Sequence, residues 1–542
     1  MSSAKVHARL VASVRTTTRQ ERLDSLCQRL PLAEPPPPRE NRMVRLRPQL
    51  VADWPKLAWV ACLTTGADEL EVLHGPMVEV AHDWIAEAVW AGDFAKGDFD
   101  QTDLVFGSGL RIRGDRATFV SAGTAMDRLW YCTRTGCHSV SNSLPALLAA
   151  AQLWLRDDYP SYREDIETVE HRGIRSYVKA IPTTTVDVSV LYFSNLVYDG
   201  HELKEVDKPG ISRTFRSFSD YFDFLTSTAR QLSHNMRSGA RANEVRPLVG
   251  ISSGYDSCAT AVVAKHAGCT EAVSIANSTS LWRGCDSGEA IADRLGMSCR
   301  VYRHRRGNYR LEESIWAAAG RAGGLNFTLF DYPEPLCAFF CGSYGDTVWD
   351  RVPHDLSEPV GNFDCLLGEF RVLQGIFNCV VPWWGVRQVQ QIHAINWSEE
   401  MEPWTLHSNY DRPIARRIVE EAGVPRGTFA TIKRNTSAND AFLWPFTRPA
   451  QDSFASYLRR GGLYVPPRWA IAPLRAFSKT SNLLYQNAVQ PLGWRKWWRP
   501  WLTSRSRELL FQWANDELKR RYERGLPAAN LRPAGHREAV QA

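Results

Sequence analysis

Residues 249–268, VGISSGYDSCATAVVAKHAG, decide the fold that the sequence predicts. An apolar strand enters a turn of two serines, a glycine, a tyrosine and an aspartate, and a helix then runs to Gly268. Two strand-like runs, 271–277 and 299–305, follow on either side of a second helical run, 285–297. Strands alternating with helices at this pitch predict an α/β fold with a doubly wound parallel sheet.

The turn after the first strand has the side chains of a phosphate site. It lies at the carboxyl edge of the sheet, where α/β folds bind ligands, and a helix N-terminus attracts phosphate. Gly254 leaves room for phosphate oxygens, and Ser252, Ser253 and Ser257 can donate hydroxyl hydrogen bonds. Asp256 would repel phosphate unless a cation such as Mg2+ lay between them. The alternative is that Asp256 and Ser257 only cap the helix.

A family resemblance starts from the same turn. SSGYDS at 252–257 resembles the S-G-G-x-D-S signature of PP-loop ATP pyrophosphatases, with Ser253 in place of the first glycine. Further segments resemble, in order, the asparagine synthetase and β-lactam synthetase group of that superfamily: VSIAN (273–277), CDSGEAIADRLG (285–296), FDYPEP (330–335), CGSYGDTVWD (341–350), CVVPWWGVR (379–387) and the stretch 410–434. The resemblance implies a PP-loop synthetase domain.

This resemblance also implies site residues. ATP would bind at the turn and at the strand that supports adenine, through Ser252, Ser253, Gly254, Tyr255, Asp256, Ser257 and Ile275. Asp256 and Asp346 would hold Mg2+, and Lys433 would be the catalytic lysine, although a surface lysine beside Arg434 is the alternative. Tyr344 is a second catalytic candidate, one residue out of register with a tyrosine of β-lactam synthetases.

The acceptor side departs from the family. The family's glutamate, arginine and aspartate of that region fall on Asn378, Val380 and Gly385. Asn378 can hydrogen-bond but cannot take a proton from an amine. Glu369 is another possible base, although we expect it to be an exposed structural side chain. Trp383 and Trp384 would make this side bulky and apolar.

The N-terminal half is predicted to be a separate α+β domain. Strand-like runs alternate with turns over about 43–210, and a short helix is expected at 144–155. Residues 128–150 resemble part of the class II glutaminase domain that precedes these synthetases. That domain needs a cysteine directly after the initiator methionine, where this chain has Ser2 and Ser3. We therefore expect a degenerate domain that keeps the fold without releasing ammonia from glutamine.

The expected organisation has four parts. Residues 1–42 form a flexible arm, 43–210 the glutaminase-like domain, 211–480 the synthetase domain and 481–542 a helical, basic, Trp-rich extension. The synthetase domain opens with a helix capped by Ser217 or Ser219, and a later helix is expected at 413–423. The chain is expected to turn helical after about residue 350. The stretch WRKWWRPW at 494–501 is read as a helix end packed on the body.

Composition limits the remaining classes. The 65 Lys and Arg nearly balance 59 Asp and Glu, so charge alone does not predict nucleic-acid binding. No run of 18 apolar residues and no apolar signal segment is present, so we expect a cytoplasmic protein without a membrane partner. Twelve cysteines without a C-x-x-C pair favour reduced, mostly buried thiols over zinc ligands. The oligomeric state stays open.

These features together predict an ATP-dependent ligase. With ATP and Mg2+, it would activate a small-molecule or peptide carboxylate as an acyl-adenylate and pass it to an amine, releasing AMP and pyrophosphate. One alternative is a macrolactam cyclase of the lasso type, which predicts a precursor peptide encoded nearby. Another is a catalytically inactive protein that binds a nucleotide or a partner. An RNA-modifying enzyme is less favoured, because the N-terminal half resembles a glutaminase.

Overall fold

The structure of the chain is a computed structural model. It describes residues 44–210, 212–276, 285–303, 308–351, 367–408, 410–430, 444–484 and 503–526. The chain separates into two compact units, Met1–Arg42 and Met43–Ala542. The predicted arm, 1–42, is the first unit and lies outside the described residues.

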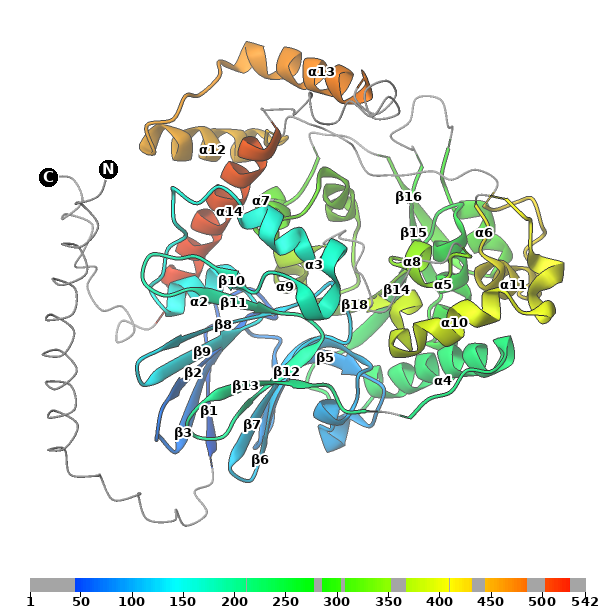
Figure 1. The fold of residues 1–542 in the computed structure, drawn as a ribbon, viewed down its shortest axis with the longest axis horizontal. Coiled ribbons are helices and arrows are strands. Elements are labelled where there is room, and N and C mark those ends of the chain that lie inside the picture. The colour runs from blue at the N-terminus through cyan, green and yellow to red at the C-terminus, as the bar shows by residue number, and fades with distance from the viewer. Residues whose placement is uncertain are drawn as a thin grey trace, which may run out of the picture. The chain divides into compact units, whose positions relative to one another are not determined.

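Two mainly antiparallel sheets make up the N-terminal half (Figure 1). The first has the order β1 (Arg45–Leu50), β3 (Glu69–His74), β2 (Trp59–Thr64), β9 (Cys137–Ser141), β8 (Leu129–Arg134), β11 (Val188–Leu191), β10 (Ala180–Ile181). The second has the order β13 (Leu203–Asp207), β12 (Ser194–Tyr198), β7 (Arg116–Val120), β6 (Val105–Arg113), β5 (Trp84–Trp90), β4 (Glu79–Val80). Alternate apolar side chains of both sheets, such as Trp59 and Ile85, share one core.

Within the predicted strand-rich stretch 43–210, the run VSVLYFSNLVYDG at 188–200 divides between these sheets. Its first part is β11 and its second part is β12, so the chain changes sheet between Leu191 and Ser194. The predicted helix at 144–155 is shorter, α2 (Leu144–Ala150), and begins after Ser143, whose hydroxyl accepts from the N–H of Ala146. The helix α3 (Tyr162–Ser176) was not predicted.

A five-stranded parallel sheet forms the centre of the C-terminal half. Its order is β16 (Ser298–Tyr302), β15 (Glu271–Ile275), β14 (Val245–Gly250), β17 (Leu336–Cys341), β18 (Ile376–Val380). The predicted α/β class and the three predicted strands are confirmed. The expectation that the chain is helical after about 350 is wrong at β18, which is buried throughout and pairs with β17.

The strand order reverses at β14. Chain order proceeds outward from β14 to β15 and β16 on one side, then resumes at β17 on the other. The carboxyl ends of β14 and β17 therefore flank the switch point of the sheet, which is where open α/β sheets place their ligand crevice.

Helices accompany this sheet. They are α4 (Phe218–Met236), α5 (Tyr255–His266), α6 (Glu289–Arg294), α7 (Glu312–Ala317), α8 (Gly345–Val348), α9 (Gly368–Gln374), α10 (Val389–Asn396) and α11 (Pro413–Glu421). Ser217 caps α4 as predicted, because its hydroxyl accepts from the N–H of Asp220. The expected helix at 413–423 is α11.

Three later helices complete the described chain: α12 (Arg448–Arg460), α13 (Arg468–Leu484) and α14 (Thr503–Gly525). The last helix joins the two halves, since Ser143 donates to the hydroxyl of Tyr522 at 3.2 Å and Asn515 donates to the carbonyl of Ala317 at 3.0 Å. The predicted C-terminal extension is therefore helical at α14 but packs into the body. The Trp-rich stretch 494–501 lies outside the described residues.

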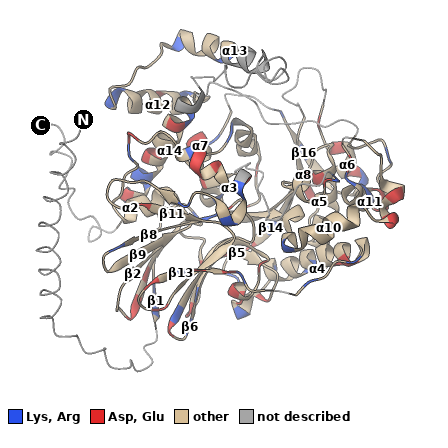
Figure 2. Cartoon of the chain, in the orientation of Figure 1, with Lys and Arg blue, Asp and Glu red and all other residues tan. Residues whose placement is uncertain are grey.

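Charge and cysteine content agree with an ordinary folded body. Lys and Arg are interspersed with Asp and Glu over the sheets and helices (Figure 2). The ten cysteines in the described ranges are all free thiols, as predicted, and six of them are buried. In the same ranges, no helix is both long and apolar enough to cross a membrane.

Candidate functional site

The turn after β14 is braced by its own serines. The hydroxyls of Ser252 and Ser257 lie 2.8 Å apart, and the backbone N–H of Ser252 donates to Ser257 Oγ at 3.0 Å. The backbone N–H of Gly254 donates to Ser252 Oγ at 3.2 Å. Gly254 itself is the N-cap of α5 and has no side chain with which to cap the helix. Capping of the helix therefore does not account for Asp256, whose carboxylate instead accepts a hydrogen bond from the guanidinium of Arg412.

A second loop presses against the first at the switch point. It follows β17, and glycine is needed at two of its positions. A Cβ at Gly342 would lie 2.6 Å from the carbonyl carbon of Asp256, and one at Gly345 would lie 2.2 Å from its Cγ. The next residue, Asp346, is near enough for its charge to raise the pKa of Asp256. The two predicted metal ligands are thus neighbours, although they lie 90 residues apart in the sequence.

Asp256 is the electrostatic centre of this region. Burial raises the pKa of its carboxyl, the guanidinium of Arg412 opposes that rise, and the charges of Asp346 and Asp350 add to it. Arg412 Nη1 donates to Asp256 Oδ2, while Arg412 Nη2 lies 3.6 Å from an oxygen of Asp350. The other oxygen, Asp256 Oδ1, is buried and has no hydrogen-bond partner in the described chain. It is an acceptor that a cation can satisfy.

Arg412 is held by this carboxylate pair inside the protein. Its side chain is only 2 % exposed, against 20 % for that of Asp256. Burial alone would lower the pKa of Arg412, but the ion pair with Asp256 raises it above its usual value. Sequence reasoning missed Arg412 and Asp350, because both lie within segments interpreted only as family-like helix and loop. The available signal was the run YDRP at 410–413, with an arginine at the start of a Pro-initiated helix.

The predicted Tyr255 contributes packing. Its side chain is fully buried, its hydroxyl accepts from Arg416, and its ring meets that of Tyr410 edge-on at 4.9 Å between centroids. Tyr410, which was also missed, has its hydroxyl 3.7 Å from the position of a Cβ on Gly254. An aromatic hydroxyl therefore faces the turn from the segment that carries Arg412.

Ser253 and Ile275 belong to the other wall of the turn. Ser253 Oγ donates to Asp286 Oδ1 at 2.5 Å, and its N–H donates to the carbonyl of Asp286 at 3.2 Å. The serine that replaces the family's glycine thus ties the turn to the segment before α6. Ile275 is the last residue of β15 and is half-buried at the carboxyl edge of the sheet.

Tyr344 and Asn378 are both buried. Tyr344 is 3 % exposed, and its ring centroid is 4.5 Å from that of Trp383. Asn378 is fully buried on β18 and donates to Asp127 Oδ1 of the N-terminal half at 3.1 Å. Asn378 therefore makes a contact between the two halves of the chain, and the carboxylate of that contact belongs to Asp127.

Glu369 is not exposed, contrary to expectation. It lies on α9 with 7 % of its surface accessible, and its Oε2 accepts from Ser143 Oγ at 2.8 Å. Burial raises its pKa to about 7, while Ser143 and the nearby arginines Arg128 and Arg371 oppose the rise. Its hydrogen-bond partner Ser143 lies in the N-terminal half and also contacts Tyr522 of α14, so Glu369 acts between the halves and not at the turn.

Lys433 lies outside the described residues. Ala430, the last residue described before it, donates its N–H to the carbonyl of Ser253 at 2.7 Å. Ala430, three residues before Lys433 in the sequence, is thus held against the turn.

A divalent cation fits the chemistry of these residues. Asp256, Asp346 and Asp350 bring three carboxylates against one guanidinium, and one buried oxygen of Asp256 has no partner. Carboxylate oxygens are the ligands that Mg2+ prefers, together with phosphate oxygens and water. Among the described residues, however, no group of three or more His, Cys, Asp or Glu side chains is arranged so that it could hold a metal ion by itself. Mg2+ would therefore need phosphate oxygens as additional ligands.

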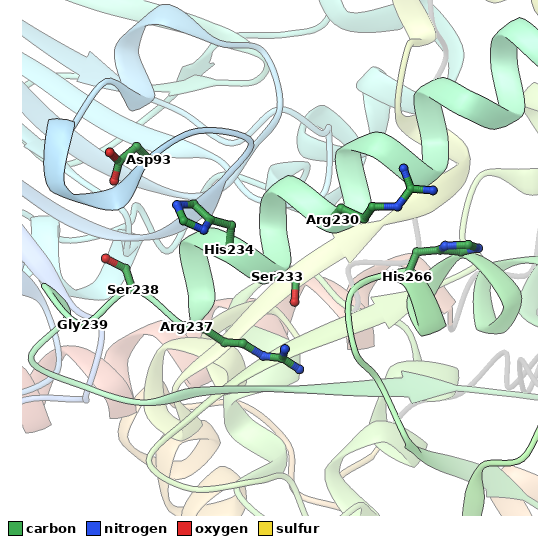
Figure 3. Close-up of a pocket in the computed structure, with 8 residues that line it drawn as sticks. All are labelled: Asp93, Arg230, Ser233, His234, Arg237, Ser238, Gly239 and His266. Atoms are coloured by element: carbon green, nitrogen blue, oxygen red, sulfur yellow. The ribbon is translucent and has the colours of Figure 1, made fainter.

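A separate hollow lies at the other end of α5 (Figure 3). It has a volume of about 540 Å3 and is lined by Asp93, Arg230, Ser233, His234, Arg237, Ser238, Gly239 and His266. The twelve residues of α5 separate it from the turn by about 18 Å. It is not part of the site around Asp256.

No model of a known protein family matches the chain, and a search of curated proteins finds no match. The assignment of the site therefore depends on its own geometry and on the motif resemblance.

Proposed function

We propose that the chain is an ATP-dependent ligase of the PP-loop type that forms an amide bond and releases AMP and pyrophosphate. The observation that carries the proposal is the meeting of two loops at the switch point of the parallel sheet. Gly342 and Gly345 allow the loop after β17 to reach Asp256 in the loop after β14. A turn–helix junction with an aspartate, joined there by a second aspartate, suits a metal–triphosphate ligand.

Each part of the turn then has a role toward ATP. The first turn of α5, where Gly254 provides no capping side chain, offers N–H groups to phosphate oxygens. Ser252 and Ser257 hold the turn in shape, and Ile275 offers an apolar edge to the adenine. Asp256 and Asp346 would hold Mg2+, which when bound neutralises phosphate charge during pyrophosphate departure. Lys433 would add positive charge to the same leaving group.

We assign water exclusion and binding of the acceptor amine to the apolar side of the turn, which Trp383 and Trp384 form. Trp383 and Trp384 are each 1 % exposed, and Tyr344 packs on Trp383. We assign the substrate carboxylate and the amine to this side of the turn. Asn378 is occupied by Asp127, so the proton of the amine would leave through another base or water.

Pyrophosphate release tests this function. The full chain would be incubated with ATP, Mg2+ and panels of small carboxylates, amines and products of neighbouring genes. The proposal expects substrate-dependent release that is lost in Asp256→Asn and kept in Glu271→Gln, which changes a half-exposed acid on β15. Release of phosphate and ADP instead of pyrophosphate and AMP would contradict it.

One observation favours a second candidate, an inactive nucleotide-binding protein. Arg412 donates to Asp256 Oδ2, so a guanidinium already occupies one of the two oxygens proposed for the metal. A cation held there permanently by the protein would let the turn bind phosphates without Mg2+. ATP binding that is unchanged by EDTA, with no pyrophosphate release on any substrate, would select this candidate.

A further inference from the structure

The helices α12 and α13 lie beyond α14, at the edge of the described structure (Figure 1). The inner side of α13 is anchored. Ile471 is 7 % exposed, and Arg475 donates to the carbonyls of Trp444 and Pro445. The guanidinium of Arg475 also stacks 4.4 Å from the ring centroid of Phe446. These contacts determine which face of α13 is turned outward.

The outward face is apolar. Tyr464, Trp469 and Phe477 are 80 %, 79 % and 66 % exposed, the three highest values among the large apolar side chains of the described residues. Trp469, Pro473 and Phe477 follow one another at intervals of four, so they share one side of α13, and Ala476 lies exposed beside them. A contiguous exposed apolar stripe marks an interaction surface more often than a solvent face.

Exposed arginines lie at the end of α12 and at the start of α13, close in sequence to this stripe. Arg459, Arg460 and Arg468 are exposed on α12 and at the start of α13 (Figure 2). Arg468 contacts Asp452 at 2.5 Å, but both side chains are more than half exposed, so the pair is weak. The sequence from 453 to 507 contains ten Lys and Arg, ten aromatic residues and no Asp or Glu, which leaves 55 basic against 59 acidic residues elsewhere. The chain's net positive charge is therefore concentrated in this part of the sequence, which includes α12 and α13.

We propose that the α12–α13 surface, defined by Tyr464, Trp469, Phe477, Arg459, Arg460 and Arg468, binds an anionic membrane surface. Helices that lie in the lipid interface combine one apolar aromatic face with Lys and Arg around it. Tryptophan and tyrosine favour the headgroup level, and arginines gain from the negative potential of anionic lipids. Such a helix needs no membrane-spanning length. The proposal therefore replaces the expectation of no membrane partner, which was based only on the lack of a spanning segment.

The apolar stripe favours lipid over nucleic acid. Nucleic acid would satisfy the arginines and could stack on the aromatic rings. It would leave Pro473 and Ala476 in water, because their side chains offer no stacking surface and no hydrogen-bond donor. A lipid interface removes all of them from water together. This inference is independent of the ligase proposal.

Vesicle co-sedimentation of the full chain tests the proposal. Vesicles would contain phosphatidylcholine alone, or with about a third of phosphatidylserine to set the negative surface potential. Trp469→Ala/Phe477→Ala and Arg459→Gln/Arg460→Gln are each expected to weaken binding to the anionic vesicles about tenfold or more. The matched control is Trp397→Ala, which removes another exposed tryptophan, 58 % accessible, and is expected to bind as the wild type does.

Each possible result of this experiment either supports the lipid proposal or overturns it. Thermal unfolding midpoints within the wild-type range would show that the variants are folded, and wild-type binding should weaken as salt is raised. No binding of the wild type to anionic vesicles overturns the proposal, and so does equal binding by all variants. Binding of a single-stranded oligonucleotide that Trp469→Ala/Phe477→Ala abolishes, without vesicle binding, would assign the surface to nucleic acid and also overturn it.

Discussion

Arg412 determines the state of Asp256. A carboxylate at the start of a buried helix would be costly without a counter-charge, and burial does raise its pKa. The guanidinium of Arg412, itself 2 % exposed, supplies that charge at one oxygen and leaves the other oxygen without a partner. The pair can therefore stabilise the turn in the absence of a metal ion while keeping one acceptor available.

Removing Arg412 should destabilise the protein. In Arg412→Gln the carboxylate of Asp256 loses its counter-charge, and we expect the free energy of unfolding to fall by about 3 kcal/mol. Denaturant unfolding measures this. The double variant Asp256→Asn/Arg412→Gln should recover part of the loss, because the two residues interact directly. Arg426→Gln, which removes a half-exposed ion pair with Glu420, should cost less than about 1 kcal/mol. Equal losses in both single arginine variants would contradict the pairing.

Substitution of Gly254 should weaken ATP binding without lowering the stability of the fold. An added Cβ would meet Ser252 Oγ at 3.4 Å and Tyr410 Oη at 3.7 Å, both ordinary contacts. The backbone at φ −82° also accepts alanine. Gly254→Ala should therefore unfold like the wild type but bind ATP at least about tenfold more weakly, because the methyl group occupies phosphate space. Gly239→Ala, where an added Cβ meets nothing within 4 Å, is the control for equilibrium binding. Unchanged affinity in Gly254→Ala would remove the turn from the phosphate site.

At the scale of elements, the site depends on α5 and α8 meeting at the switch point. An alanine at Gly345 would collide with Asp256 Cγ at 2.2 Å. Gly345→Ala should therefore push the two loops apart, lower stability by about 2 kcal/mol and abolish ATP-dependent activity. Unfolding and activity measured together test this. Wild-type stability in the variant would show that the loops do not pack as described.

The sequence predicted the elements from β14 to β16 because each has a strand or helix period and a glycine stop, such as Gly268 and Gly296. It did not predict β18, since a strand buried on both faces shows no alternation. Asp256 and Asp346 were placed together by the motif resemblance alone, because the strand before Asp346, β17, was not predicted from its own residues. Arg412 could not be placed there, because an arginine is usually exposed and only tertiary packing reveals a buried one.

At the scale of the molecule, Glu369 links both halves through Ser143 of the N-terminal half and α14. Its pKa rises from 4.5 to about 7 on folding. Between these two pH values the folded chain therefore keeps a proton on Glu369 that the unfolded chain has lost. The stability that this proton provides is complete below pH 4.5 and is lost as the pH rises through 7. The free energy of unfolding of the wild type should therefore fall between pH 5 and pH 8, relative to that of Glu369→Gln, by on the order of 3 kcal/mol. The variant has no carboxyl at this position and should not share the loss.

Denaturant unfolding at the two pH values checks this, with Glu334→Gln as the control. Glu334 is 66 % exposed beside Lys56 and should show no such difference. A difference between Glu369→Gln and wild type that does not change with pH would mean that the carboxyl is ionised throughout, held by Arg128 and Arg371.

The most direct test of the central claim is the Mg2+ dependence of ATP binding to the full chain. Calorimetric titration would compare wild type and Asp256→Asn, each with Mg2+ and with EDTA. The account predicts that Mg2+ strengthens ATP binding to the wild type at least about tenfold, and that Asp256→Asn loses this gain. ATP binding that is equally strong in EDTA and survives Asp256→Asn would contradict the metal–nucleotide site at the meeting of the two loops.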